Sequence, residues 1–349
     1  MNQPNPASEQ AGSPLESRYR RLLRAYPRDY QAERGDEIVG TYLDTVEPGR
    51  RWPSPHDSVD LLGAGIRERL RGYGALGLAA AFPLAATAAL NTLVAVAIFL
   101  LLQVEFEDPR FARLDSVGPF QTLGAVIWLG WLFVGLAATV RPGAWARTAA
   151  AGALLLTVAV PPVAALLGQP GPPLFVLLPA VALGLATLAL PSHPGRAARS
   201  LPLLTAGYMT AASAALSAAE SGGGMFVSYS STPELLAMAG GLMFALILLV
   251  GLGRALRADD AGLWAALLLA TPASLFGANM LSQGIWGSRG GGPTPAAFAI
   301  TTGSILLAGA ALLTVAVTGQ AVRHRTVRRR ALDSACPTCG HRRKVTAVA

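Results

Sequence analysis

The sequence predicts an all-α protein: a polytopic transmembrane bundle of about eight spans that follows a small N-terminal amphipathic helical module. Two observations predict this fold. Of the 349 residues, 52% are hydrophobic and 14% are charged, which is more apolar surface than a water-soluble chain of this length usually carries. From Gly77 onward, long apolar segments follow one another, each close to the ~20 residues that cross a hydrocarbon core.

The first part of the chain predicts two amphipathic helices after a disordered lead. Residues 1–12 are rich in Asn, Pro, Ser and Gln and have too little apolar content to fold. Helical spacing of apolar residues then begins at Ser13-Pro14, with Leu15, Tyr19, Leu22, Leu23 and Tyr26 on one face. A second helix, roughly Asp29 to Val46, carries its own apolar face, made of Ile38, Val39, Tyr42, Leu43 and Val46. Gly35 is a weak point inside that second helix.

A third amphipathic helix completes the predicted module, residues 13–74. Ser54 or Asp57 can cap it, and its apolar stripe is expected to contain Val59, Leu62, Ile66, Leu70 and Tyr73. Residues 1–74 contain equal numbers of arginines and acids, which favours three helices packed on one another. The alternative is that they lie on the membrane surface, because the first helix carries four arginines that suit an anionic interface.

Eight apolar segments predict the transmembrane bundle over residues 77–320. They lie at about 77–103, 120–140, 148–168, 174–190, 201–219, 234–253, 261–281 and 296–320. Pro161-Pro162 is expected to break the third segment, and the turn that follows it is short. If 148–190 were a single span, the count would be odd and the C-terminal tail would lie on the other side of the membrane.

The arginines of the connecting loops predict the orientation in the cell membrane. With the N-terminus in the cytoplasm, the cytoplasmic loops contain Arg141, Arg147, Arg196, Arg199, Arg254 and Arg257. The loops of the other side, including the acidic loop Glu105 to Asp115, contain three arginines: Arg110, Arg113 and Arg289. The positive-inside rule and the even number of spans therefore place both termini in the cytoplasm.

Polar residues are sparse inside the predicted spans. No ionisable residue lies near a span centre, so the sequence predicts no buried acid that could relay protons. Asn91 is expected to form an interhelical hydrogen bond, and Glu220 to be a solvated carboxylate at a helix end. Asn279 and Gln283 fall near the outer end of the seventh span, and an outer vestibule that contained Glu220 and Asn279 would favour transport or catalysis.

Aromatic residues of the outer loops predict an aromatic belt at the membrane interface. Phe226, Tyr229 and Trp286 lie in or beside these loops, where amphipathic rings are common. We therefore expect membrane contact from these side chains and no ligand recognition.

The tail, residues 321–349, carries most of the net charge of +8 and the two cysteines of the chain. Its arginines predict contact with anionic membrane lipid, and nucleic acid is not expected as a partner. Cys336, Cys339 and His341 form half a zinc knuckle, because tetrahedral zinc needs a fourth ligand. A homodimer could complete a four-cysteine zinc site, and the alternative is a pair of reduced thiols.

One stretch carries a family resemblance. The residues from Tyr19 to Tyr30, YRRLLRAYPRDY, continue through Glu33-Arg34-Gly35-Asp36-Glu37 to Leu43-Asp44. This stretch resembles the short cytoplasmic helical prefix of uncharacterised actinobacterial multi-pass membrane proteins and, more distantly, permease prefix domains. The resemblance covers about residues 17–72 and implies a regulatory or docking module without catalytic residues.

The functional expectation follows from the two cytoplasmic appendages on a polar-poor bundle. We expect a non-enzymatic membrane-embedded interaction or regulatory protein that docks partners through its cytoplasmic prefix and tail, with a cytoplasmic or membrane protein as partner of residues 13–74. A permease or transporter subunit is the alternative. An intramembrane lipid-modifying enzyme comes last, because no paired acids, histidine cluster or nucleophile beside a base appears in the sequence, and no catalytic or cofactor-binding residue is predicted.

Overall fold

The computed structural model describes residues 14–46, 50–72, 76–106, 117–220, 228–257, 259–287 and 293–333. Every named element in these ranges is a helix, which confirms the predicted all-α class. The chain divides into two compact units, Met1–Ala79 with Ala316–Ala349 and Ala80–Val315. The predicted disordered lead and the tail beyond Asp333 lie outside the described residues.

The N-terminal helices pack around a core of their own. They are α1 (Pro14–Leu22), the short 3-10 turn η2 (Leu23–Ala25), α2 (Arg28–Thr45) and α3 (Pro55–Gly72). The buried core side chains are Leu15, Tyr19, Leu23, Tyr26, Val39 and Leu61. The apolar faces predicted for the first two helices lie in this core, with Ile38, Tyr42, Leu43 and Val46 packed against it. Burial of these side chains stabilises the module, since each removes apolar surface from water.

Two residues predicted for the apolar face of the third helix, Val59 and Leu62, do not lie in the core, while the side chains of Ile66, Leu70 and Tyr73 are outside the described part. Leu61, not Val59 or Leu62, enters the core, and Val59 and Leu62 are 71% and 40% exposed. The reason is a close approach at Gly65, where an added Cβ would lie 2.7 Å from the Cβ of Ala25. Only a residue without a side chain fits there, so α3 turns Gly65 and Leu61, one helical turn apart, toward α1 and η2.

A capping arrangement fixes the start of α3 and ties it to α1. The hydroxyl of Ser54 accepts a hydrogen bond from the backbone N–H of Asp57 at 2.9 Å, so Ser54 is the N-cap. The carboxylate of Asp57 accepts the hydroxyl proton of Tyr19 at 3.0 Å. Hydrogen bonding from Ser54, with a further bond from Tyr19, lowers the pKa of Asp57. Burial, together with Asp57, raises the pKa of Tyr19 to about 12.

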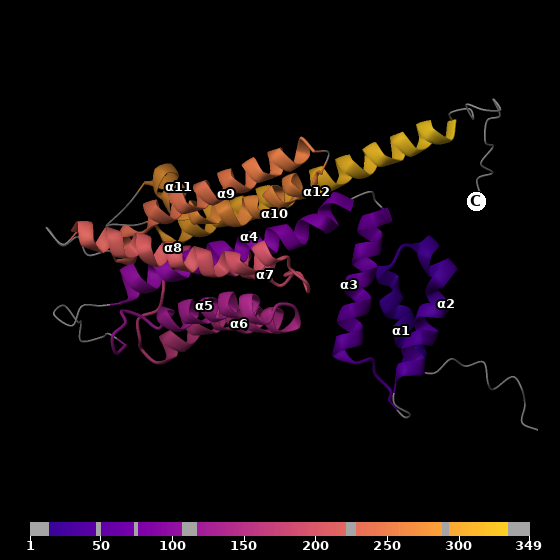
Figure 1. The fold of residues 1–349 in the computed structure, drawn as a ribbon, viewed down its shortest axis with the longest axis horizontal. Coiled ribbons are helices and arrows are strands. Elements are labelled where there is room, and N and C mark those ends of the chain that lie inside the picture. The colour runs from indigo at the N-terminus through magenta and orange to yellow at the C-terminus, as the bar shows by residue number, and fades with distance from the viewer. Residues whose placement is uncertain are drawn as a thin grey trace, which may run out of the picture. The chain divides into compact units, whose positions relative to one another are not determined.

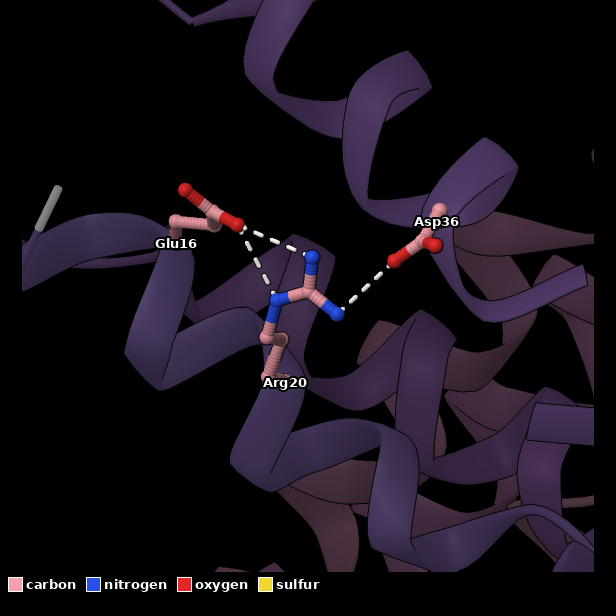
Figure 2. A network of polar contacts seen from close by, with 3 residues as sticks. All are labelled: Glu16, Arg20 and Asp36. Carbon is pink, nitrogen blue, oxygen red and sulfur yellow. Dashed lines mark hydrogen bonds and ion pairs between the residues drawn. The ribbon is translucent and has the colours of Figure 1, made fainter. Parts of the chain in front are cut away.

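Figure 2 shows a second tie, on the surface of the module. The guanidinium of Arg20 lies 3.0 Å from Glu16 on its own helix and 2.8 Å from Asp36 on α2. Both carboxylates raise the pKa of Arg20, Glu16 foremost. Because these groups are in contact with water, the ion pairs orient α1 against α2 but contribute little to the free energy of unfolding.

The second unit is a helix bundle whose elements occupy the positions predicted for the eight spans (Figure 1). These elements are α4 (Leu76–Leu100) with the π-helical turn η3 (Leu101–Glu105), α5 (Gly124–Val140), α6 (Ala144–Leu166), α7 (Leu174–Thr187), α8 (Arg196–Glu220), the 3-10 turn η4 (Tyr229–Ser231), α9 (Pro233–Ala255), α10 (Ala261–Phe276), α11 (Ala278–Trp286) and α12 (Pro295–Asp333). α9 packs along α10, α5 along α6 and α8, and α7 between α6 and α10.

Helix length separates full spans from short ones. Among the described residues, five helices are long and apolar enough to cross a membrane, and α10 with α11, bent by 56°, forms either a broken sixth span or a re-entrant loop. α5 and α7, with 17 and 14 residues, are about 25 and 21 Å long. Both fall short of the ~30 Å hydrocarbon core. The described part of the chain is therefore a multi-pass helix bundle with five or six segments of membrane-crossing length and two short apolar helices.

Pro161-Pro162 does not break the third span as expected. α6 runs through both prolines to Leu166. Two prolines remove two backbone donors, and the remaining N–H groups continue the helix. After Leu166 the chain turns away from the helix at Gly168, whose φ of +65° is a left-handed conformation. The backbone N–H of Gln169 donates to the carbonyl of Ala164 at 2.9 Å and closes this turn. α6 and α7 are therefore separate helices, and 148–190 is not a single span.

The bundle has two chemically different ends. At the first, called here the Glu105 end, the C-terminus of α4 meets the start of α5 and the turn between α8 and α9, through Gln121 and Tyr229. At the opposite end, called the arginine end, Arg147 donates to Ser192 at 2.5 Å and Arg199 to the carbonyl of Thr139 at 3.0 Å. The helices thus alternate in direction between these two ends.

Candidate functional site

The candidate site begins with a buried acid that the sequence did not predict. Glu105 was expected in an exposed acidic loop, but it is the last residue of η3 and is fully buried. In η3 the backbone N–H of Phe106 bonds to the carbonyl of Leu101, five residues earlier, at 3.1 Å. This wider turn extends the helix by a few residues and carries Glu105 inward. The expectation that the bundle has no buried acid is therefore wrong.

Donors from two other parts of the chain surround the Glu105 carboxyl group. Thr122 donates its hydroxyl to Oε1 at 2.6 Å and its backbone N–H to Oε2 at 2.9 Å. Tyr229, from η4, donates its hydroxyl to Oε1 at 2.5 Å, and Trp128 Nε1 donates to the Tyr229 hydroxyl at 3.2 Å. Residues 105, 122, 128 and 229, called the Glu105 network below, thereby join α4, α5 and η4.

Close packing encloses the Glu105 network. A Cβ added at Gly124 would meet Oε1 of Glu105, the Thr122 hydroxyl and the Tyr229 hydroxyl. Burial raises the pKa of Tyr229, and the neighbouring Glu105 carboxyl raises it further, so this phenol stays a proton donor. The predicted aromatic-belt role for Tyr229 is therefore wrong: its hydroxyl points into protein. Trp286 is exposed, as a belt residue would be.

A cavity of about 870 Å³ lies next to this network at the Glu105 end. α7, η4, α9, α11 and α12 line it, and Tyr229 forms part of its wall. Its apolar side chains are Leu174, Phe175, Leu178, Phe298 and Leu306. Because its volume falls within the ~300–1,000 Å³ of small-molecule sites, the cavity has room for one ligand of that size.

Uncharged polar groups line the same cavity. Asn279 and Gln283, one turn apart on α11, share a hydrogen bond in which Gln283 Nε2 donates to Asn279 Oδ1 at 3.0 Å. The hydroxyl of Thr302, a residue only 7% exposed, is buried without a hydrogen-bond partner. None of the described residues that line the cavity carries a charge. The cavity is therefore amphipathic, with hydrogen-bonding capacity and apolar walls.

Asn91 lies on a second, apolar cavity of about 470 Å³ between α4, α8 and α9. The hydroxyl of Thr205 on α8 donates to Asn91 Oδ1 at 3.0 Å, and Asn91 Nδ2 donates to the carbonyl of Thr87 at 2.7 Å. Asn91 thus forms the interhelical hydrogen bond that the sequence predicts. With its amide paired on both sides, Asn91 acts here as a link between α4 and α8.

Several predicted site residues lie elsewhere or outside the described part. Cys336, Cys339 and His341 fall in the tail that the structure does not describe, so the zinc site stays a prediction. No cluster of three metal-ligating side chains occurs within the described residues. Glu220 ends α8, and its side chain is also outside what is described. Asn279 and Gln283 do line a cavity, but the acid beside that cavity is Glu105.

Comparison with known proteins adds no family. No family model, no curated protein and no solved structure matches this chain. The fold itself defines the class: an all-α, multi-pass membrane helix bundle with a small N-terminal helical module.

Proposed function

We propose that this multi-pass protein is a non-enzymatic interaction or regulatory protein that binds a protein partner through its N-terminal module, residues 13–74. The observation that carries the proposal is the exposed pair Val59 and Leu62 on α3. The module already has a core of its own, so this pair is not needed for its packing. An exposed apolar pair of this kind on a module with its own core suits a protein contact.

Copurification from native membranes tests this docking role. We expect a partner to purify with the full chain, and to be lost both when residues 1–74 are deleted and in the double variant Val59→Asp, Leu62→Asp. The matched control is Ala32→Asp with Thr41→Asp, two exposed positions on α2 that add the same charge. Retention of every partner by the deletion and the α3 variant would reject the proposal, as would equal loss in the control.

We also propose that the protein lies in the cell membrane with both termini in the cytoplasm. In support, Arg141, Arg147, Arg199 and Arg254 follow or begin helices at the arginine end, opposite Glu105. The positive-inside rule assigns that end to the cytoplasm.

The two native cysteines, Cys336 and Cys339, test this orientation. A membrane-impermeant thiol reagent is expected to leave them unlabelled in intact cells and to label them after permeabilisation. Labelling in intact cells would show that the tail lies outside and would overturn the orientation.

A permease or transporter subunit is the second candidate function. It is favoured by the buried Glu105 and by the cavity beside it, since buried acids in membrane bundles often mark substrate or ion pathways. The copurification test separates the two candidates, because a permease that acts alone needs no partner at Val59 and Leu62.

A further inference from the structure

We propose that the cavity between α7, η4, α9, α11 and α12 binds one molecule of an uncharged lipid with hydroxyl or ester groups, of the size of a monoacylglycerol. This ligand is independent of the docking role proposed for the N-terminal module. The proposal rests on three properties of the cavity: its amphipathic lining, the lack of charge among its described lining residues, and the exposed leucines at its edge.

The polar lining selects the headgroup. Thr302 has a buried hydroxyl without a partner, which is costly unless something accepts or donates a hydrogen bond there. The pair Asn279 and Gln283 uses one donor and one acceptor on each other, which leaves the Asn279 N–H groups and the Gln283 carbonyl for a ligand. These groups match hydroxyl and ester oxygens. The described lining residues carry no charge and so offer no counterion for a phosphate or a carboxylate.

The apolar lining selects the tail. Phe175 and Leu178 from α7 contribute one wall, and Phe298 and Leu306 from α12 another. Leu174 and Leu306 are 59% and 47% exposed, so the walls continue to the outer surface of the bundle, where exposed leucines are numerous. An acyl chain can therefore enter from the bilayer without crossing a polar barrier.

The Glu105 network gives this cavity a fixed wall. The Tyr229 hydroxyl donates to Glu105 and accepts from Trp128, so it is turned away from the cavity while the residue itself lines it. With its hydroxyl held at two points, Tyr229 keeps the cavity shaped before a ligand arrives, which favours binding.

A photoactivatable monoacylglycerol with a diazirine in its acyl chain tests the proposal on the full chain in nanodiscs. We expect saturable crosslinking to peptides of α7 and α12 that excess unlabelled monoacylglycerol blocks. Excess oleate or phosphatidylglycerol should compete at least about tenfold less well, because burying a charge without a counterion is unfavourable. Equal competition by the charged lipids would overturn the proposal, as would crosslinking that does not saturate.

Two pairs of variants locate the site. Gly303 lines the cavity and has open space where a Cβ would be, so Gly303→Phe should fill the cavity and abolish saturable crosslinking. Gly319→Phe, with equally open space on the same helix but off the cavity, should bind like the wild type. Unchanged crosslinking in Gly303→Phe would overturn the proposal.

The second pair separates binding from folding. Thr302→Val removes only the unpaired hydroxyl, so the thermal midpoint of unfolding without lipid should not fall, while the affinity should drop roughly fivefold. Thr301→Val is the control, because its hydroxyl donates to the carbonyl of Ala297 at 2.9 Å and it does not line the cavity. Equal affinity of Thr302→Val and the wild type would contradict the assigned headgroup contact.

Discussion

Replacing Glu105 with Leu is expected to destabilise the bundle by about 3 kcal/mol. The substitution leaves three donors without their acceptor: the backbone N–H and the hydroxyl of Thr122 and the hydroxyl of Tyr229. Each unpaired buried donor costs about 1–3 kcal/mol. Removing a buried carboxyl group also removes its desolvation cost, which offsets part of this loss but leaves the three donors unpaired.

The thermal midpoint of the full chain in detergent measures this effect. Glu105→Gln should lose about 1 kcal/mol. Its amide oxygen still accepts a hydrogen bond, but its NH2 group places a donor against a donor of Thr122. Gln103→Leu, two residues earlier, is the control: this half-buried side chain donates to the Ser213 carbonyl and the Ser217 hydroxyl at the bundle surface. If Glu105→Leu were as stable as the wild type, the Glu105 network would not hold the bundle end together.

The helices were predictable from sequence because hydropathy and helical spacing are local properties. Apolar segments of membrane-crossing length gave the positions of α4 to α12, and apolar spacing gave the core faces of α1 and α2. The lengths of α5 and α7 were predicted too long, because Phe120 and Leu123 before α5 and Leu188 to Leu190 after α7 extend the apolar pattern without extending the helix.

The candidate site could not be predicted, because it depends on contacts between distant segments. Glu105 stands beside Glu107 and Asp108 in the sequence, which is typical of a solvated loop. Its burial needs Thr122 and Tyr229, which lie 17 and 124 residues away. One local signal was present: Gln103 and Glu105 continue directly from an apolar helix, with Val104 buried between them. The cavity likewise unites α7 and α12, more than 100 residues apart.

The orientation of α3 shows a different limit of sequence reasoning. At helical spacing, Val59 and Leu62 belong to a more apolar stripe than Leu61 and Gly65, so the pattern predicted that Val59 and Leu62 face the core. Glycine contributes nothing to an apolar pattern, although its lack of a side chain decides where two helices can touch. The close approach of η2 at Gly65, and not the apolar pattern, therefore decides which side of α3 faces the core.

Two glycine-to-alanine substitutions in the N-terminal module should change its free energy of unfolding in opposite directions. In Gly65→Ala the new Cβ would lie 2.7 Å from the Cβ and 2.9 Å from the carbonyl carbon of Ala25. Backbone atoms cannot yield as a flexible side chain can, so the module should lose about 1–3 kcal/mol. In Gly35→Ala the nearest atom is Leu23 Cδ1 at 3.8 Å, an ordinary contact. Alanine should then stabilise α2 by about 0.5–1 kcal/mol, because glycine has more conformational freedom to lose.

Hydrogen exchange of the α1, α2 and α3 amides in the full detergent-solubilised chain measures both changes within one experiment. Faster exchange is expected throughout the module in Gly65→Ala and slower exchange in Gly35→Ala, with the amides of α5 and α6 unchanged in both. Gly65→Ala should also weaken partner binding, since the contact of Gly65 with Ala25 is what leaves Val59 and Leu62 exposed. Normal exchange in Gly65→Ala would mean that α3 does not approach η2 at this glycine, and the assignment of Val59 and Leu62 as the docking face would lose its structural basis.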